Sequence, residues 1–206
     1  MNKKLTLLNK ILLLFGLVLA GAESQGQFFW LGFQAGEGIS WFTNPGVDSI
    51  SLSEGNGTSL GFFIRYGKRP YYQVAFEWLT TNNQVRINVE PGVTKKSNFP
   101  VHSFKVPITA GYEVVHRPKF KWRIGGGFFI GPTVPLSSNA FNFNKSDFKN
   151  PQFGVIGETG IQYFNFLILV DYNYSLTKLF NKNAGDYGMN LDSHMQIFAL
   201  KAGLQF

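Results

Sequence analysis

Apolar and polar residues alternate with a period of two along most of the chain, and polar segments rich in Asn, Gly and Ser separate these stretches. A period of two places every second side chain on the same face of a β-strand. Beyond the N-terminal apolar segment, no stretch shows the period of an amphipathic helix. The pattern predicts an all-β chain with strands at residues 28–42, 57–67, 70–82, 101–114, 120–133, 151–163, 166–178 and 194–206.

The lengths of these strands and of their connections favour a membrane barrel. Each strand reaches the roughly 9 to 11 residues that a tilted strand needs to cross a bilayer, whereas soluble strands usually stop near five or six. Short connections at 67–70, 115–119 and 164–165 alternate with polar loops at 43–56, 83–100, 134–150 and 179–193. This alternation predicts an eight-stranded antiparallel up-and-down transmembrane β-barrel, with tight periplasmic turns at one rim and long extracellular loops at the other.

The last strand explains why the chain ends at Phe206 without a tail. Free termini normally fray into solvent, but a barrel has no free edge once its last strand pairs with its first. We therefore expect strand 194–206 to close against strand 28–42. Both chain termini then lie at the turn rim, on the periplasmic side of an outer membrane.

The two faces of the strands indicate which of them meets lipid. Large apolar side chains occupy one face, and small or polar ones occupy the other. A lipocalin-like soluble carrier would alternate too, but its exterior would be rich in Lys and Glu. Here charged residues make up only 15% of the chain, below the roughly 25% of soluble domains. In strand 70–82 the apolar face holds Tyr72, Val74, Phe76 and Trp78, and the polar face holds Gln73, Ala75 and Glu77.

Aromatic residues near strand ends are expected to form the girdles that membrane barrels place at the two interfaces with water. Glu37 is the exception, because strict alternation puts it on the apolar face of the first strand. Either a β-bulge around Gly36 and Gly38 turns it inward, or it lies near the rim, where an acidic side chain costs little. The predicted girdle residues are Trp41, Tyr66, Tyr72, Tyr112, Trp122 and Tyr163.

Seven charged residues fall on the inward face, one on each strand from the second to the eighth. An eight-stranded barrel is only wide enough for side chains to fill it, and buried charges need partners. We therefore expect an ionic network that plugs the lumen, with a gated pore for ions or solutes as the alternative. The predicted network consists of Arg65, Glu77, Lys105, Arg123, Glu158, Asp171 and Lys201.

The N-terminus predicts export. A basic MNKK start, an apolar run at 11–20 and Ala20-Gly21-Ala22 match a signal peptide over residues 1–22, leaving a barrel domain at 23–206. The apolar run is too short for a membrane-spanning helix. Without its three lysines, 16 Lys and Arg remain against 12 Asp and Glu, an excess too small to suggest nucleic acid. The absence of Cys excludes disulfides, zinc thiolate sites and a lipoprotein anchor.

Several segments resemble the PorT-like outer-membrane β-barrel family of the Bacteroidota, eight-stranded barrels of OmpA-like size. They are GFQAGEGIS (32–40), FKVPITAGY (104–112), GGGFFIGP (125–132), FGVIGETGIQY (153–163), VDYNYSLTKL (170–179) and IFALKAGLQF (197–206). Pro107 and the terminal Phe206 are the most distinctive matches. The resemblance implies that Phe206 and Leu204 belong to the signal read by the barrel-assembly machinery; the alternative is ordinary lipid-facing packing.

Catalytic chemistry finds little support in the sequence. His102, His116 and His194 show no spacing typical of a Ser-His-acid triad or a metal site, so we expect neither an enzyme nor a cofactor. One enzymatic alternative is a lipid-modifying site at the loop rim, built from Ser103 and His102 beside Glu90 or Asp192.

Specific function is expected in the loops, which is where surface barrels differ most. Loop 134–150 interleaves Phe141, Phe143 and Phe148 with Asn and Lys, which suits either a glycan or protein partner or packing of the loops on one another. The sequence thus predicts a monomeric, non-enzymatic outer-membrane anchor that presents four extracellular loops for surface binding or envelope integrity. An accessory subunit of a type IX-like secretion or surface-assembly machine is the alternative, suggested by the resemblance alone.

Overall fold

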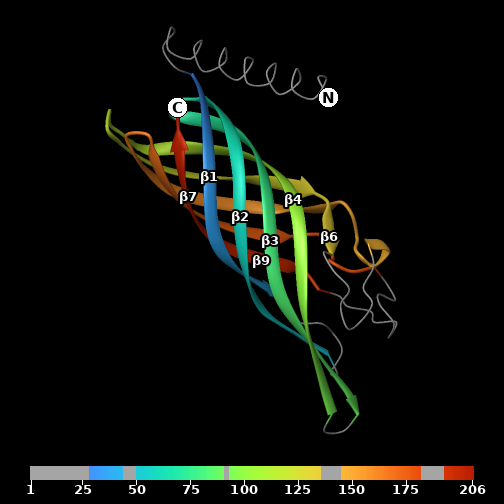
Figure 1. Ribbon diagram of the computed structural model, residues 1–206. Helices are drawn as coiled ribbons and strands as arrows, with labels where there is room; N and C mark the ends of the chain where they lie inside the picture. The colour runs from blue at the N-terminus through green and yellow to red at the C-terminus, as the bar shows by residue number, and fades with distance from the viewer. Residues whose placement is uncertain (1–27, 44–49, 91–92, 136–144, 182–192) are drawn as a thin grey trace, which may run out of the picture.

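A computed structural model describes residues 28–43, 50–90, 93–135, 145–181 and 193–206 (Figure 1). The predicted signal peptide, 1–22, lies outside these ranges. No helix in the described part of the chain has the length and apolarity to cross a membrane. The elements are β1 (Phe29–Phe42), β2 (Ile50–Gly67), β3 (Pro70–Glu90), β4 (Val93–His116), β5 (Phe120–Gly131), β6 (Thr133–Pro135), a 3-10 turn η1 (Lys145–Asp147), β7 (Gln152–Tyr163), β8 (Phe166–Ser175) and β9 (Met195–Gln205).

The strands form one closed antiparallel barrel, which confirms the predicted fold class. Its wall runs β1-β2-β3-β4-β5-β7-β8-β9, and β9 pairs with β1 to close it. The short β6 continues β5 beyond Pro132 and pairs with β4. At the end of the chain, Leu31 N donates to Phe206 O at 3.0 Å and Phe206 N donates to Leu31 O at 2.7 Å. The final residue is therefore part of the closing ladder, and it lies at the same rim as the start of β1 (Figure 1).

Two of the predicted loops are largely strand, which corrects the expected alternation of short and long connections. β2 already begins at Ile50, and β3 and β4 extend to 21 and 24 residues, so that only 91–92 separate them. Residues 83–90 and 93–100 thus form a long hairpin that extends the barrel at its loop end, and β2 pairs alongside it as far as Ile87 (Figure 1). The strand alternation continues here, because Val85, Ile87 and Val89 alternate with Gln84, Arg86 and Asn88. The sequence analysis assigned this segment to a loop because it is more polar than the membrane-spanning part of the wall.

The pairing of β3 with β4 is interrupted at Pro107. Pairing holds at Val74–Ile108 and resumes at Glu77–Lys105. On its other side Pro107 stays in register with Phe129 of β5. Proline has no N–H to donate, so a strand can carry it only where a ladder bond is missing.

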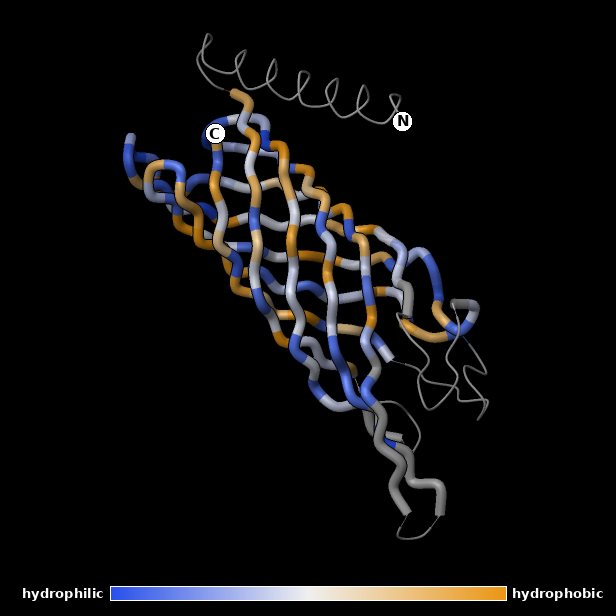
Figure 2. Tube along the Cα trace, in the orientation of Figure 1, coloured by the Kyte–Doolittle hydropathy of each residue, from blue (hydrophilic) through white to orange (hydrophobic). Residues whose placement is uncertain are grey.

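The faces follow the alternation of the sequence. The large apolar side chains of the wall are exposed on its outer surface, and its polar side chains are mostly buried inside. Hydrophobic and hydrophilic residues alternate along the strands of the trace (Figure 2). On β3, Tyr72 is 63% exposed while its neighbour Gln73 is buried. The lipocalin-like alternative is therefore wrong, because it requires the opposite orientation. The apolar surface can be exposed only because lipid rather than water covers it.

The predicted girdle residues gather mainly at the turn rim. Tyr66 and Tyr72 face each other across β2 and β3, and Phe120 faces Tyr163 across β5 and β7. Trp41 lies instead near the loop end of β1, where its Nε1 donates to Gln196 Oε1 at 3.0 Å. Tyr172 donates to the same oxygen at 2.6 Å. Aromatic side chains therefore flank the apolar band at both ends, as lipid interfaces favour.

Glu37 points outward. The register of β1 is continuous with both β2 and β9 through this position, so the expected bulge around Gly36 and Gly38 is wrong. The irregularity lies on the neighbouring strand, between Ser53 and Asn56 of β2. Glu37 is therefore a carboxylate on the outer wall of the barrel.

Candidate functional site

The centre of the barrel holds an ion-paired triad. Lys201 Nζ of β9 lies 2.6 Å from Glu77 Oε1 of β3 and 2.8 Å from Asp171 Oδ2 of β8. Gln34 Nε2 also donates to Glu77 Oε1, at 2.5 Å, and Asn173 donates to Asp171. All three charged side chains are at most 4% exposed. One ammonium thus serves two buried carboxylates, and each carboxylate has a second donor from an amide.

Lys105 lies inside the barrel without an ion pair to any residue that the structure describes. Its Nζ lies 4.5 Å from the centroid of the Phe129 ring, a cation–π contact across the β4–β5 pair. The aromatic face supplies part of the stabilisation that a carboxylate would otherwise provide.

Tyr71 crosses the lumen towards the opposite wall. Its hydroxyl donates to Glu158 Oε1 at 3.1 Å, and the Arg65 guanidinium carbon lies 4.5 Å from the centre of its ring. A methyl group at Gly125 would lie 2.8 Å from the Tyr71 hydroxyl. The phenol therefore occupies space that exists because β5 carries glycine at this inward position.

Two arginines share one amide oxygen nearer the turn rim. Arg65 Nη1 and Arg123 Nη1 donate to Gln205 Oε1 at 2.8 and 3.2 Å, and Arg65 also donates twice to Gln73 Oε1. The Nε and Nη2 donors of Arg123 find no acceptor among the described residues. Glutamine side chains, rather than carboxylates, hold this end of the lumen together.

All seven charged residues predicted for the lumen lie inside it, and each is at most 7% exposed. Three of them meet in ion pairs, whereas Arg65, Lys105, Arg123 and Glu158 contact aromatic rings, amides or hydroxyl groups. The sequence analysis missed Glu113, which is 2% exposed and pairs with His116. Strict alternation along β4 places Glu113 on the same face as Lys105, so this signal was present in the pattern.

The crowded lumen favours a plug over a pore. In a water-filled channel the lining charges would be accessible to solvent, but here side chains from opposite walls meet each other directly. Gly111 and Gly125 leave room for the large Tyr71, whose side chain a methyl group at either glycine would meet.

The candidate catalytic residues of the loop rim do not converge. Ser103 points inward and bonds Thr133 Oγ1 at 3.0 Å, while the adjacent His102 points outward and bonds Thr80 Oγ1 at 2.7 Å. His194 Nδ1 is held by the carbonyl oxygen of Ser175 at 2.9 Å. Asp192 and the side chain of Glu90 lie outside the described part of the structure. Within that part, no three His, Asp or Glu side chains are grouped as metal ligands.

The described portion of loop 134–150 packs against the next loop. Phe148 and Phe180 are both 3% exposed, form a β-bridge and place their ring centroids 5.2 Å apart. Lys149 N also donates to Leu179 O at 3.0 Å. For Phe148, packing between loops is therefore observed. Phe141 and Phe143 lie outside the described residues.

The sequence profile of the outer membrane protein β-barrel domain matches residues 23–181. The chain belongs to this family. The match spans well over half of the sequence and agrees with the closed barrel and its apolar outer band. No protein of curated function matches the chain in sequence.

Several solved outer-membrane proteins are similar to this chain at low sequence identity. The outer membrane protein OprG of Pseudomonas aeruginosa is 13% identical, with a TM-score of 0.52 over 86% of this chain and 95% of OprG. The Neisserial surface protein A is 13% identical, with a TM-score of 0.49 over 87% and 98% of the two chains. Ail, the attachment invasion locus protein of Yersinia pestis, is 15% identical, with a TM-score of 0.46 over 86% and 99%. The likeness to OprG supports the fold alone.

Proposed function

We propose that the protein is a non-conducting outer-membrane anchor whose loop rim binds a partner at the cell surface. The observation that carries this proposal is the filled lumen. Because the Lys201 triad, Tyr71 and the two arginines occupy the interior, we expect no conduction through the barrel. The surface left for a specific function is the loop rim.

The long β3–β4 hairpin is the strongest candidate for that surface. Residues 83–90 and 93–100 extend the barrel at its loop end and pair continuously from Asn83–Phe99 to Asn88–Thr94. A hairpin whose backbone is already paired loses less conformational entropy on binding than an unpaired loop. With the loops extracellular and both termini periplasmic, it meets a glycan or protein outside the cell. The barrel itself acts as a monomeric anchor in the lipid, inserted by the barrel-assembly machinery that reads Leu204 and Phe206.

The test uses a shortened hairpin. Gln84 and Asn98 face each other directly, so Asn-Gly can replace residues 85–97 as a two-residue turn. The change removes the β3 partners of Ile50, Ser51 and Leu52 at the loop end of β2, and it keeps the strand pairs between Gln84 and the turn rim. Cells that display this variant should bind glycan arrays and host or bacterial surface proteins more weakly than cells that display the full chain. The purified wild-type barrel should also give no stepwise conductance in a planar bilayer. Equal binding by both chains, or regular conductance steps, would contradict the proposal.

The purified barrel and the cells that display it can also test the two alternative functions, an accessory role in secretion and a lipid-modifying enzyme. The segments that resemble PorT-like proteins support an accessory role in secretion, and partners that co-purify stoichiometrically in mild detergent would favour that role. A lipid-modifying enzyme would change the lipid profile of the cells, and joint replacement of His102 and His194 would abolish the change. For a binding anchor, we expect neither result.

A further inference from the structure

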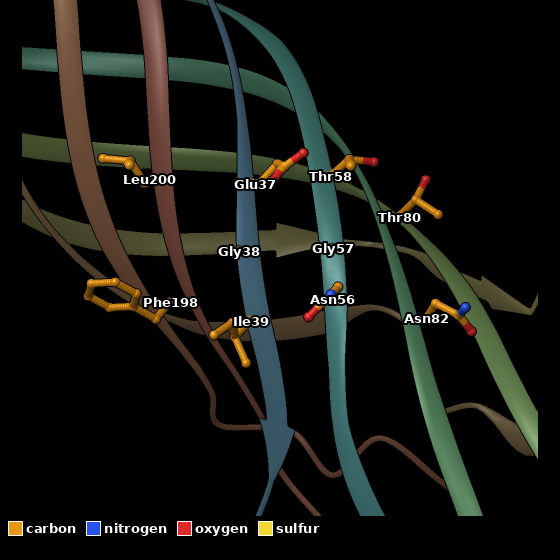
Figure 3. Close-up of a pocket in the computed structure, with 10 residues that line it drawn as sticks. All are labelled: Glu37, Gly38, Ile39, Asn56, Gly57, Thr58, Thr80, Asn82, Phe198 and Leu200. Carbon is orange, nitrogen blue, oxygen red and sulfur yellow. The ribbon is translucent and has the colours of Figure 1, made fainter.

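A hollow of about 520 Å³ opens on the outer wall of the barrel, where β9, β1, β2 and β3 lie side by side (Figure 3). We call it the outer groove. One row of outward side chains crosses it in direct register from Leu200 through Glu37 and Thr58 to Thr80. Its β9 side is therefore apolar, and its β2 and β3 side is polar. This amphipathic division is unusual for a wall that faces acyl chains.

A second row lies nearer the loops and repeats the division. It runs from Phe198 through Ile39 and Asn56 to Asn82, again one residue from each strand. The hollow exists because these Thr and Asn side chains are short, whereas large residues stand around them. Trp78, two residues before Thr80, is 51% exposed.

The Glu37 carboxylate is the charged group of the groove. It forms no hydrogen bond or ion pair with any residue that the structure describes. In Figure 3 its side chain extends towards Thr58 across the β1–β2 pair. The side chains of Asn56, Thr58 and Asn82 likewise have no hydrogen-bond partner among the described residues. A carboxylate and three hydrogen-bonding groups thus face the membrane together.

The groove lies at the loop-side edge of the apolar band. The outward apolar residues end at Leu60 on β2 and at Trp78 on β3, and the next outward residues are Thr58 and Thr80 of the groove. On β1, Glu37 is four residues from Trp41 of the loop-side girdle. Lipid headgroups meet acyl chains at this level, and a carboxylate without a partner among the described residues attracts a positively charged group there.

We propose that the outer groove binds one membrane lipid whose headgroup carries a primary ammonium. The ammonium donates to Glu37, and Thr58, Asn56 and Asn82 bond the oxygen atoms of the headgroup. An acyl chain then runs along Phe198 and Leu200. The groove is thus a site for an aminolipid in the leaflet nearer the loops, separate from the binding surface proposed for the loop rim.

The charge of Glu37 disfavours a second copy of the chain or an anionic lipid in the outer groove. A second copy related by a two-fold axis through the groove would bring one Glu37 towards the other, and like charges repel in a medium of low dielectric constant. An anionic headgroup would meet the same carboxylate. A quaternary ammonium has no N–H to donate, so it would gain the charge attraction but not the hydrogen bond.

The experiment is native mass spectrometry of the whole mature barrel, released from detergent with equimolar phosphatidylethanolamine, phosphatidylcholine and phosphatidylglycerol of identical acyl chains. The wild-type protein should retain phosphatidylethanolamine about tenfold more than either other lipid, since a hydrogen bond to a charged group accounts for about that factor. Glu37→Gln should abolish this preference. Thr58→Val should weaken it while leaving the carboxylate in place.

Glu54→Gln is the matched control. Glu54 is an exposed glutamate of β2 outside the outer groove, so its loss changes net charge equally and should leave the preference intact. Each variant is first shown to migrate as a compact barrel before heating. Equal retention of the three lipids by the wild type, or an unchanged preference in Glu37→Gln, would overturn the proposal. A wild-type dimer that Glu37→Gln dissociates would also overturn it, in favour of a protein interface.

Discussion

Lys201 Nζ of β9 lies 2.6 Å from Glu77 Oε1 of β3, although the two strands do not pair and the residues stand 124 positions apart in the chain. The same ammonium reaches Asp171 of β8. A single side chain therefore joins distant parts of the wall across the lumen. Its position makes it the most sensitive point of the buried charge network.

Replacing Lys201 with Met should lower the free energy of unfolding by about 3 to 5 kcal/mol, because it leaves two buried carboxylates without their cation. Glu77→Gln should cost less, since Asp171 keeps its partner. Urea unfolding in detergent micelles, followed by tryptophan fluorescence, measures both effects. Lys149→Met, at an exposed loop position, is the control and should change little. If Lys201→Met unfolds at the same urea concentration as this control, the triad does not stabilise the barrel.

The glycine beneath Tyr71 provides a second prediction. A methyl group at Gly125 would lie 2.8 Å from the Tyr71 hydroxyl and 3.2 Å from Glu158 Oε1. Gly125→Ala should therefore destabilise the barrel by about 1 to 3 kcal/mol through overpacking. In a Tyr71→Phe background the same change should cost less, because the hydroxyl has been removed. A double-mutant cycle measured by urea unfolding gives the coupling between the two residues.

Gly157→Ala is the control for this cycle. Gly157 of β7 faces Gly126 across the β5–β7 pair, and a methyl group there meets no atom within 4 Å. It should be close to neutral in both backgrounds. Strictly additive costs for Gly125→Ala and Tyr71→Phe would show that the phenol does not need the space above Gly125.

Variants of Phe206 should affect assembly of the barrel in the outer membrane more than they affect its free energy of unfolding. The Phe206 backbone closes the β9–β1 ladder, whereas its side chain is 45% exposed on the outer wall. Phe206→Ala keeps the backbone bonds, so the refolded barrel should lose at most about 1 kcal/mol, while its level in the outer membrane of cells should fall several-fold. Deletion of Phe206 should lower both quantities. Normal outer-membrane levels of Phe206→Ala would limit the side chain to lipid-facing packing.

The shortened hairpin, with Asn-Gly in place of residues 85–97, should still fold as a closed barrel. It retains the buried hydrogen bond from Ser40 Oγ to Asn83 Oδ1, 2.6 Å long, but it loses the pairing of β3 with residues 50–52 at the loop end of β2. We expect its free energy of unfolding to fall by about 1 kcal/mol, because only these cross-strand pairs of the wall are lost. The temperature at which the compact band disappears on gels reports this directly. A large drop would mean that the hairpin is part of the barrel's stabilising structure.

The period-two alternation of the sequence was sufficient to predict the strands of the barrel wall and the direction of their side chains. Strands such as 70–82 alternate clearly because one face meets lipid and the other a narrow lumen, so each residue's polarity reports its direction. The same rule placed Lys105, Asp171 and the other lumen charges inside. It was not followed into 84–90, where Val85, Ile87 and Val89 alternate with polar residues although β3 is longer than a membrane span requires.

The sequence by itself determined which face each wall residue occupies, and hence the fold class, the apolar outer band and the set of buried charges. Only the tertiary structure decided the partners: Lys201 with Glu77 and Asp171, Tyr71 with Glu158, and the two arginines with Gln205. It also placed the polar side chains of β2 and β3 beside Glu37 in one groove. The physical reason is that polarity is a local property of each residue, whereas contacts across a lumen or between strands depend on the register and closure of the whole barrel.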